Sequence, residues 1–231
     1  MRVVSVIQAR MGSSRLPGKV MFPLGDKTIL QHVVDKARKI SDEEVYIVTD
    51  YDSISQLSVQ GATILPAYGL VSNRFRKLFY ELYERDISYN DVLFVRLCGD
   101  QPFVDDNLVS PLADILYKTG ADYAGYMVGG RPSALTAYGI YPEVFRGSLM
   151  TVTDPSDHVT LPIYMRPDLY KCAWIDHEPY VDYINKRDYL QFSLTIDSIL
   201  DYYRLVYWYN EGKYFNPGGD PFKNDERYDW L

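Results

Sequence analysis

Apolar residues fall in short continuous runs that are typical of strands buried within a sheet. The first run, 2–8, has apolar residues at both odd and even positions, so both faces of that strand are apolar. Further strands are expected at 45–49, 62–65, 92–97, 122–126 and 189–195, with a strand pair within 170–183. A sheet buried on both sides needs helices on both of its faces.

Helical spacing separates these runs. Ile29, Val33 and Ala37 share one face of a helix expected over 29–38, and Thr28 is placed to cap its first turn. Other helices are expected at 53–58, 72–84, 106–119, 158–165 and 198–211, whereas 129–152 has no regular pattern. Strand, helix and strand in this order form a βαβ unit. The sequence therefore predicts an α/β fold with a doubly wound, mostly parallel sheet.

The length of 231 residues suits one domain with a single large core. We expect one domain over 1–231, with a late insertion over 129–185 and a polar tail over 216–231. Tyrosine occurs 22 times and is dense from Tyr164 to Tyr228. An apolar ring with a polar tip suits the edge of a core and equally the interface of a homodimer, and both interpretations stay open.

Charge and apolar run length argue against nucleic acid and membranes as partners of this protein. The net charge of −7 argues against nucleic acid, because a protein that binds such a polymer presents a basic face to many phosphates. No segment has the length of apolar sequence that a membrane span needs, and no signal peptide is expected. With neither a membrane span nor a signal peptide expected, we expect a cytoplasmic protein. Cys98 and Cys172 lack the spacing of a metal site and are expected to be reduced thiols.

Cations and small residues cluster directly after the first strand. They are Arg10, Gly12, Ser13, Ser14, Arg15, Gly18 and Lys19. Cationic side chains, hydroxyls and backbone N–H groups left open by glycine together form a site for a polyphosphate. A P-loop does not fit, because five residues separate the two glycines and Val20 follows the lysine. A dinucleotide fingerprint is absent as well, so no redox cofactor is expected.

The segment from Ile7 to Val20, IQARMGSSRLPGKV, resembles the signature loop of the sugar cytidylyltransferases, the group that activates acylneuraminate and Kdo. It is most similar to the spore-coat polysaccharide branch of that family. The resemblance implies a Rossmann-like, GT-A-like nucleotidyltransferase that uses CTP and Mg²⁺. It further implies transfer of CMP to a sugar acid of the nonulosonic type, with release of pyrophosphate, in surface polysaccharide biosynthesis.

The resemblance also implies roles for individual residues. Nucleotide binding falls to the loop and to a helix start, at Ala9, Arg10, Gly12, Ser13, Ser14, Arg15, Lys19, Asn73 and Arg74. Catalysis falls to Arg10, Lys19, Asp100 and Asp197, and the two carboxylates are also the expected ligands of the metal. His158 and Gln101 are expected to bind the acceptor.

Several of these residues have simpler readings when taken one at a time. Asp100 lies within 99–102, whose glycine, aspartate and proline are common in β-turns, and Asp197 could cap the final helix. Arg74 could belong to a solvated helix face, and His158 could start a helix. We favour the metal role for the carboxylates, because one or two carboxylates with phosphate oxygens are how proteins bind Mg²⁺.

Two places depart from the family pattern. Arg76 and Lys77 stand in the helix where the spore-coat branch carries an acidic residue, and Thr136 stands where an acid is expected. The identity of the acceptor is therefore open. One alternative is a nucleotidyltransferase or glycosyltransferase of the same architecture that uses another nucleotide or a phosphorylated sugar or alcohol. A second alternative is a non-catalytic nucleotide-binding protein.

Overall fold

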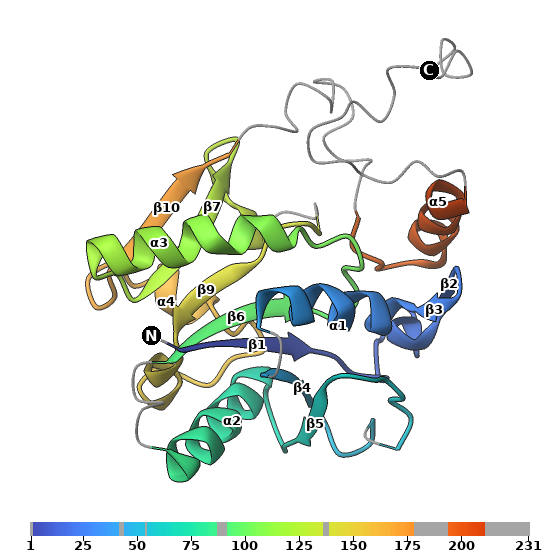
Figure 1. The fold of residues 1–231 in the computed structure, drawn as a ribbon, viewed down its shortest axis with the longest axis horizontal. Coiled ribbons are helices and arrows are strands. Elements are labelled where there is room, and N and C mark those ends of the chain that lie inside the picture. The colour runs from blue at the N-terminus through green and yellow to red at the C-terminus, as the bar shows by residue number, and fades with distance from the viewer. Residues whose placement is uncertain are drawn as a thin grey trace.

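The computed structural model describes residues 2–41, 44–53, 55–86, 92–135, 139–177 and 194–210. These ranges contain an eight-stranded sheet with the strand order β10-β7-β9-β6-β1-β4-β5, and β8 pairs with β7 beside this path (Figure 1). The strands are β1 (Arg2–Gln8), β4 (Val45–Thr49), β5 (Thr63–Pro66), β6 (Val92–Cys98), β7 (Tyr123–Val128), β8 (Arg131–Pro132), β9 (Glu143–Arg146) and β10 (Cys172–Asp176).

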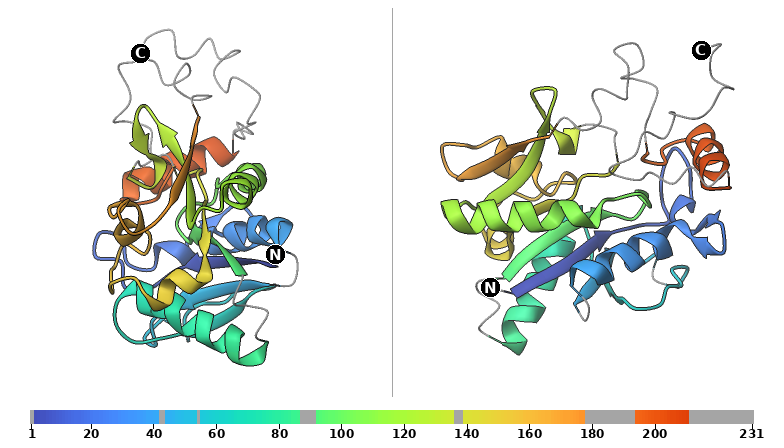
Figure 2. Two further views of the ribbon diagram at one scale, coloured as in Figure 1. Left: turned by 90° about the vertical axis from the view of Figure 1, so that its left-hand side faces the viewer. Right: turned by 45° about the horizontal axis from the view of Figure 1, so that its top comes forward.

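Helices cover both faces of this sheet (Figures 1 and 2). α1 (Ile29–Ile40) and α3 (Val109–Thr119) pack on one face, and α2 (Val71–Arg85) packs on the other. The remaining elements are β2 (Pro23–Leu24), β3 (Lys27–Thr28), α4 (Leu161–Tyr164), α5 (Ile199–Asn210) and the 3-10 helices η1 (Lys19–Met21), η3 (Asp106–Leu108), η4 (Ser133–Leu135) and η5 (Gly147–Thr151). The predicted α/β class with a mostly parallel sheet is confirmed. None of the helices in the described ranges is long and apolar enough to cross a membrane.

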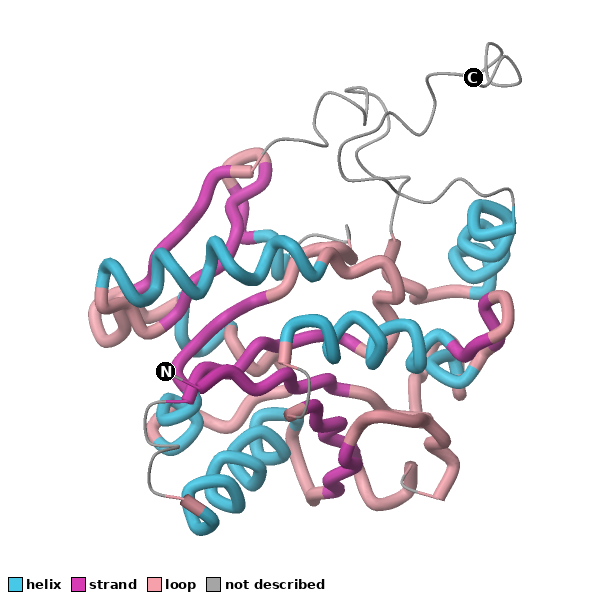
Figure 3. Tube along the Cα trace, in the orientation of Figure 1, coloured by secondary structure: helices cyan, strands magenta, loops and turns pink. Residues whose placement is uncertain are grey.

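β1 lies in the middle of the sheet and is apolar on both faces, as its sequence predicts. It runs parallel to both of its neighbours, β4 and β6. Val4 and Val6 pack with Phe75 of α2, whereas Ile7 packs with Val33 of α1, and all of these side chains are fully buried. Because the three parallel strands end at the same edge, the loops that follow them gather there (Figure 3).

Thr28 caps α1 as expected. Its Oγ1 accepts a hydrogen bond from the backbone N–H of Gln31 at 3.2 Å, which satisfies one of the open N–H groups of the first turn. The hairpin of β2 and β3 leads directly into this cap. The cap therefore fixes where the chain turns from the opening loop into the first helix.

The structure differs from the sequence-based expectations mainly between residues 129 and 177. The segment expected to be irregular contains β9, which lies between β6 and β7 and runs antiparallel to both. Its sequence, EVFR, has charged residues at both ends, and these hide the apolar pattern. The helix expected at 158–165 is only the four-residue α4, and 53–58 forms turns where it is described. Much of the strand pair expected within 170–183, most of the strand at 189–195, Thr136 and the tail 216–231 lie outside the described residues.

Tyrosines of the C-terminal region occupy two environments. Tyr164 packs at the edge of the core against Tyr123 and Trp174, with ring centroids 5.7 and 6.0 Å away. Tyr203 on α5 is 62% exposed. The core-edge reading therefore accounts for Tyr164, and the homodimer interface stays a prediction.

A buried ionic network crosses the α2 face of the sheet. Glu143 of β9 lies opposite Arg96 of β6, and their side chains form an ion pair. The Oε1 atom of Glu143 also accepts hydrogen bonds from the hydroxyls of Tyr123 and Thr160, both at 2.7 Å. Burial, followed by the nearby Glu143, raises the pKa of Tyr123 well above its ordinary value, so the phenol keeps its proton and stays a donor. Glu143, only 2% exposed, thus joins β6, β7 and the segment before α4.

We expect Glu143→Ala to lower the free energy of unfolding by about 3–5 kcal/mol, because it leaves the Arg96 guanidinium without its carboxylate in a buried site. Urea denaturation followed by far-UV circular dichroism measures this loss. Asp114→Ala is the matched control, since it breaks an exposed ion pair with Lys118 on α3. Equal stability of the two variants would contradict the assigned role of Glu143.

Candidate active site

A cavity of about 330 Å³ opens where β1 and β6 end. Its walls come from the loop after β1, the start of α2 and three later segments. The lining residues are Gln8, Ala9, Arg10, Ser13, Ser14, Arg15, Lys19, Val20, Val71, Arg74, Asp100, Asp157, His158 and Asp197. Ten of the residues predicted from the sequence as site residues lie in this set: Ala9, Arg10, Ser13, Ser14, Arg15, Lys19, Arg74, Asp100, His158 and Asp197.

Within the loop after β1, one backbone carbonyl accepts two hydrogen bonds and so draws the two ends of the loop together. The oxygen of Met11 accepts hydrogen bonds from the backbone N–H of Ser13 at 2.9 Å and of Gly18 at 2.8 Å. Gly18 has φ +73°, in the left-handed region that favours glycine, and the chain turns there into η1. The Met11 N–H donates to Ser53 Oγ at 2.8 Å, which ties the loop to the segment after β4. These contacts carry Lys19 back over the end of the sheet.

Lys19 lies between two carboxylates. Its Nζ is 2.5 Å from Asp100 Oδ2 and 3.2 Å from Asp197 Oδ1, and it donates to the carbonyl of Ile196 at 2.5 Å. The lysine side chain is only 9% exposed, so these contacts form in a partly desolvated site where charge pairing is strong. Arg15, which is far more exposed, places its Nη2 2.9 Å from the same oxygen of Asp197. Two cations and two carboxylates therefore meet at one point.

Three hydrogen bonds hold the backbone around Asp197. The N–H of Ile196 donates to the carbonyl of Asp100 at 3.1 Å, which joins the two metal-ligand candidates through the main chain. Asp201 Oδ2 accepts from the N–H groups of Asp197 at 3.2 Å and Ser198 at 2.8 Å. Asp201 thus serves the start of α5, whose open N–H groups favour a carboxylate. Asp197 is left with its side chain directed at Lys19 and Arg15.

Gly139 makes room for this arrangement. It has φ +71°, and a Cβ built on it would lie 2.7 Å from backbone atoms of Leu194 and Thr195. A side chain at this position would therefore push against the backbone of the segment that leads to Asp197. The sequence places Gly139 in an irregular stretch and gives no sign of this contact.

Arg74 reaches the cavity from the first turns of α2. It is 5% exposed, and its Nη2 lies 3.7 Å from Asp50 Oδ2 at the end of β4. Burial lowers the pKa of this guanidinium below its ordinary value; Asp50 opposes the shift and Arg10 adds to it. Its Nε has no hydrogen-bond partner among the described residues. A buried cation with an open donor that lines a cavity is suited to bind an anion or a carbonyl oxygen.

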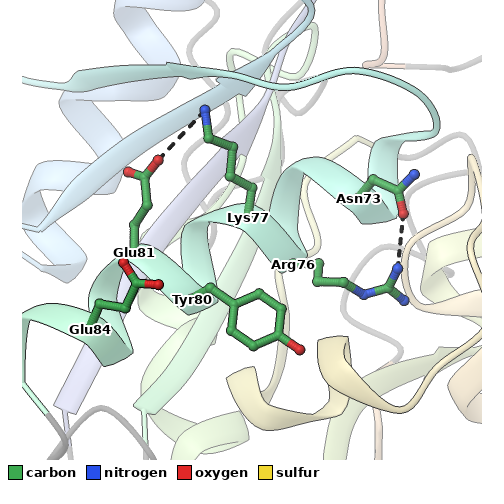
Figure 4. A pocket seen from close by; sticks show the side chains of 6 residues that line it. All are labelled: Asn73, Arg76, Lys77, Tyr80, Glu81 and Glu84. Carbon is green, nitrogen blue, oxygen red and sulfur yellow. Dashed lines mark hydrogen bonds and ion pairs between the residues drawn. The ribbon is translucent and has the colours of Figure 1, made fainter.

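Asn73, expected to bind nucleotide, lies outside this cavity. Its Oδ1 accepts a hydrogen bond from Arg76 Nη1 at 3.0 Å, and both residues line a groove on α2 with Tyr80 and Glu84 (Figure 4). Arg76 also donates to the carbonyls of Met150 at 2.6 Å and Thr153 at 2.8 Å. The cation that departs from the family pattern therefore anchors α2 to the segment around η5.

Gly12 and Gln101 also lie away from this cavity. Gly12 lines a neighbouring hollow with Asp50 and Ser53, and its φ is not in the left-handed region. Gln101 donates to Thr195 Oγ1 at 3.1 Å and lines a separate cavity of about 50 Å³. The two residues expected to bind the acceptor, His158 and Gln101, therefore line different cavities.

Sequence reasoning missed Gln8 and Asp50 as site residues. Both stand at the carboxyl end of a parallel strand, Gln8 as the last residue of β1 and Asp50 just after β4. A polar residue that ends an apolar strand run is the signal that could have indicated them. Asp157 also lines the cavity beside the predicted His158 and was not predicted.

The carboxylates of Asp100 and Asp197 fit a hard divalent cation. A single ammonium contacts both of them, so one small cation can span the same gap. Each ionised carboxylate has two oxygens with several lone pairs, so an ion pair with lysine leaves capacity for a metal. The described residues contain no group of three His, Cys, Asp or Glu side chains that could hold a metal. Phosphate oxygens and water would therefore complete the coordination shell.

The family model for cytidylyltransferases matches residues 4–188 of this chain. The chain belongs to the cytidylyltransferase family. This cytidylyltransferase is 26% identical over 212 residues to the spore coat polysaccharide biosynthesis protein SpsF of Bacillus subtilis (strain 168). The match covers 87% of this chain and 83% of that protein. It is 36% identical over 115 residues to the 3-deoxy-manno-octulosonate cytidylyltransferase of Methylococcus capsulatus. This match covers 48% of this chain and 43% of that enzyme.

Solved structures share the fold of this cytidylyltransferase. A cytidylyltransferase from Leptospira borgpetersenii matches it with a TM-score of 0.67 at 24% identity, over 96% of this chain and 91% of that chain. CMP:2-keto-3-deoxy-manno-octonic acid synthetase complexed with CTP matches with a TM-score of 0.59 at 15% identity, over 92% of this chain and 100% of that chain. The predicted family is confirmed, and with it the prediction that the protein is a nucleotidyltransferase enzyme.

We expect Lys19→Met to lower the unfolding temperature by several degrees, because Asp100 and Asp197 then repel each other without the ammonium between them. Mg²⁺ should restore much of this loss by binding between the carboxylates, so the metal should stabilise the variant more than the wild type. Differential scanning fluorimetry with and without MgCl₂ measures both effects.

Lys36→Met is the matched control, since Lys36 pairs with Asp106 at 2.8 Å and neither residue lines the cavity. Mg²⁺ should not rescue this control. Equal rescue of both variants, or of neither, would contradict a cation site at the two carboxylates.

Proposed function

We propose that this enzyme transfers CMP from CTP to a sugar acid of the nonulosonic type and releases pyrophosphate, with Mg²⁺, in surface polysaccharide biosynthesis. The observation that carries the proposal is the position of Lys19 between Asp100 and Asp197, in a cavity also lined by Arg10 and Arg15. This grouping matches what a metal triphosphate needs, namely carboxylates for the metal and cations for the phosphates.

Arg10, Arg15 and Lys19 are proposed to hold the β- and γ-phosphates. Arg15 has an exposed guanidinium that can turn from Asp197 to a ligand, and Lys19 is already held in place by its carboxylates. Their charge would stabilise the pyrophosphate as it leaves. Ser13 and Ser14 line the same cavity and offer hydroxyl donors.

Asp100 and Asp197 are proposed to hold the metal, with Mg²⁺ as the ion that suits carboxylate and phosphate oxygens. When bound, the ion would neutralise charge on the phosphates during the transfer. The protein's own contribution is to hold the two carboxylates on a joined backbone, through the hydrogen bond from Ile196 to Asp100. This preorganisation avoids the cost of bringing two like charges together when the substrate arrives.

The acceptor is proposed to enter beside Asp157 and His158. Both residues line the cavity, and the carboxylate of Asp157 lies 3.4 Å from the backbone N–H of Val71 at the start of α2. The names of the relatives, a spore coat polysaccharide protein and a 3-deoxy-manno-octulosonate cytidylyltransferase, support a sugar acid in this place. A histidine beside a carboxylate can orient an acceptor hydroxyl or receive its proton.

The transfer is proposed to be direct. The acceptor oxygen attacks the α-phosphorus in line with the departing pyrophosphate, so the enzyme needs no nucleophile of its own. Cys98, two residues before Asp100, is not suited to that role, because burial raises the pKa of its thiol to about 11 and keeps it protonated at neutral pH. Catalysis then rests on positioning and electrostatics.

CTP should raise the unfolding temperature more than ATP, GTP or UTP at equal concentration, because a ligand stabilises the folded state according to its affinity. In the presence of Mg²⁺ and a nonulosonic acid, the same preparation should release pyrophosphate from CTP.

A panel of other sugar acids and phosphorylated alcohols identifies the acceptor in this assay. Stronger protection by another nucleotide would favour the alternative transferase, and no pyrophosphate release with any acceptor would favour a nucleotide-binding protein without catalysis.

Asp100→Asn should reduce pyrophosphate release by roughly 100-fold or more, because the amide is a poor metal ligand while keeping the shape of the side chain. Binding of CTP without metal should persist, as measured by isothermal titration calorimetry. Asp106→Asn is the matched control, since Asp106 does not line the cavity. Full activity of Asp100→Asn would reject its role as a metal ligand.

A further inference from the structure

Gln8 stands where the central strand meets the cavity, and it is not among the residues expected to bind the nucleotide. It is the last residue of β1, and its backbone carbonyl accepts from the N–H of Gly99 at 2.9 Å. Because side chains alternate along a strand, Gln8 faces the same side as Val4 and Val6, which pack under α2. Gln8 lines the cavity, and so does Arg74, which comes from α2.

Arg96 fixes which end of the Gln8 amide faces the cavity. The Nε of Arg96 donates to Gln8 Oε1 at 3.1 Å. A guanidinium has donors and no acceptor, so the atom that meets it must be the amide oxygen. The opposite orientation would place two donors against each other. The NH₂ group of Gln8 is therefore the end left for other partners, and no described residue accepts from it.

The buried network holds Arg96 in this orientation. Arg96 pairs with Glu143, which also accepts from Tyr123 and Thr160. Thr160 lies two residues after His158, so Glu143 fixes two walls of the cavity, Gln8 through Arg96 and the His158 segment through Thr160. A network with each member paired is rigid, and it gives the amide a defined direction.

Two cations of the loop, Lys19 and Arg15, contact the carboxylates, whereas Arg10 lies close enough to Arg74 to lower its pKa. Lys19 begins η1, whose Val20 packs with residues of α1, and it contacts Asp100 and Asp197. A triphosphate held there by Lys19 and Arg15 leaves the α2 side, with Gln8 and Arg74, for the rest of the nucleotide. Both residues line the cavity, and the Nε of Arg74 has no hydrogen-bond partner among the described residues.

We infer that the side-chain NH₂ of Gln8 donates a hydrogen bond to an oxygen of the CMP part of the nucleotide, and that Arg96 is the positioning residue that orients it. The inference rests on the proposed function and adds a specificity residue to it. Gln8 touches substrate, whereas Arg96 acts through the Gln8 amide and Glu143 acts through Arg96 and Thr160. The pyrophosphate part, held by the loop cations, makes no use of this donor.

Two substitutions test the donor. Gln8→Glu keeps an oxygen for Arg96 but removes the NH₂ group, and Gln8→Met removes both while keeping the length of the side chain. Binding of CTP, CMP and pyrophosphate to the full chain is measured by isothermal titration calorimetry. We expect Gln8→Met to weaken CTP and CMP roughly three- to tenfold and to leave pyrophosphate unchanged. Gln8→Glu should weaken CMP at least as much, because it adds a negative charge.

Gln60→Met is the control, since Gln60 is exposed and lies outside the cavity. If the wild type binds CMP and either Gln8→Glu or Gln8→Met binds it with the same affinity, the inference is overturned while the proposed function stays intact. Failure of the wild type to bind CTP would instead count against the proposed function. If Gln8→Met does not fold, Gln8→Glu alone decides, because it preserves the contact with Arg96.

A double-mutant cycle tests the positioning role of Arg96. Arg96→Lys keeps a cation opposite Glu143 but has no Nε donor for the amide oxygen. We expect Arg96→Lys to weaken CMP binding in the wild-type background and to have no further effect when combined with Gln8→Met. A purely structural role would give the same loss in both backgrounds, and that result would overturn the positioning role.

Discussion

The ammonium of Lys19 joins parts of the chain that are almost 180 residues apart. It contacts Asp100 after β6 and Asp197 before α5, and it bonds the carbonyl of Ile196 between them. Without a cation at this point, two carboxylates would face each other in a poorly solvated site. The architecture therefore depends on a positive charge at the point where the proposed function places a metal triphosphate.

A second buried pair, Arg96 with Glu143, has a different task. It lies on the α2 face of the sheet, and within the described part of the chain neither residue bonds to Arg10, Arg15 or Lys19. A buried ion pair contributes little net stability compared with apolar packing, but it is costly to break and specific in direction. In this protein the pair orients neighbouring side chains, because Arg96 donates to the amide oxygen of Gln8 and Glu143 accepts from the hydroxyl of Thr160. The apolar core gives the fold its stability, and this pair aligns polar groups at its edge.

The fold was largely predictable from local patterns. The apolar run of β1, the face of α1 marked by Val33 and the cap at Thr28 each follow from short-range chemistry, and each is confirmed. β9 was missed because Glu143 and Arg146 flank its two apolar residues, and only tertiary contacts explain why such a charged segment is buried.

The candidate site was predictable as a set of residues but not as a geometry. The loop motif named the cations, yet it could not show that Lys19 is held by both carboxylates. Asn73 and Gly12 lie next to residues that line the cavity but do not line it themselves, since neighbours in sequence can face opposite ways. Gln101 lies in its own small cavity because it hydrogen-bonds Thr195. Sequence indicates which residues are near a strand end, and side-chain direction decides which of them meet a ligand.

The reversed direction of β9 has a consequence for how this enzyme can change. Because β9 runs against β6 and β7, the segment that enters it comes down to the same sheet edge at which the parallel strands finish. That segment supplies Gly139 and Tyr141 to the small cavity, while the loop after β1 serves the larger one. Substitutions in the entering segment therefore reach the larger cavity indirectly, because a side chain at Gly139 would displace the backbone that leads to Asp197.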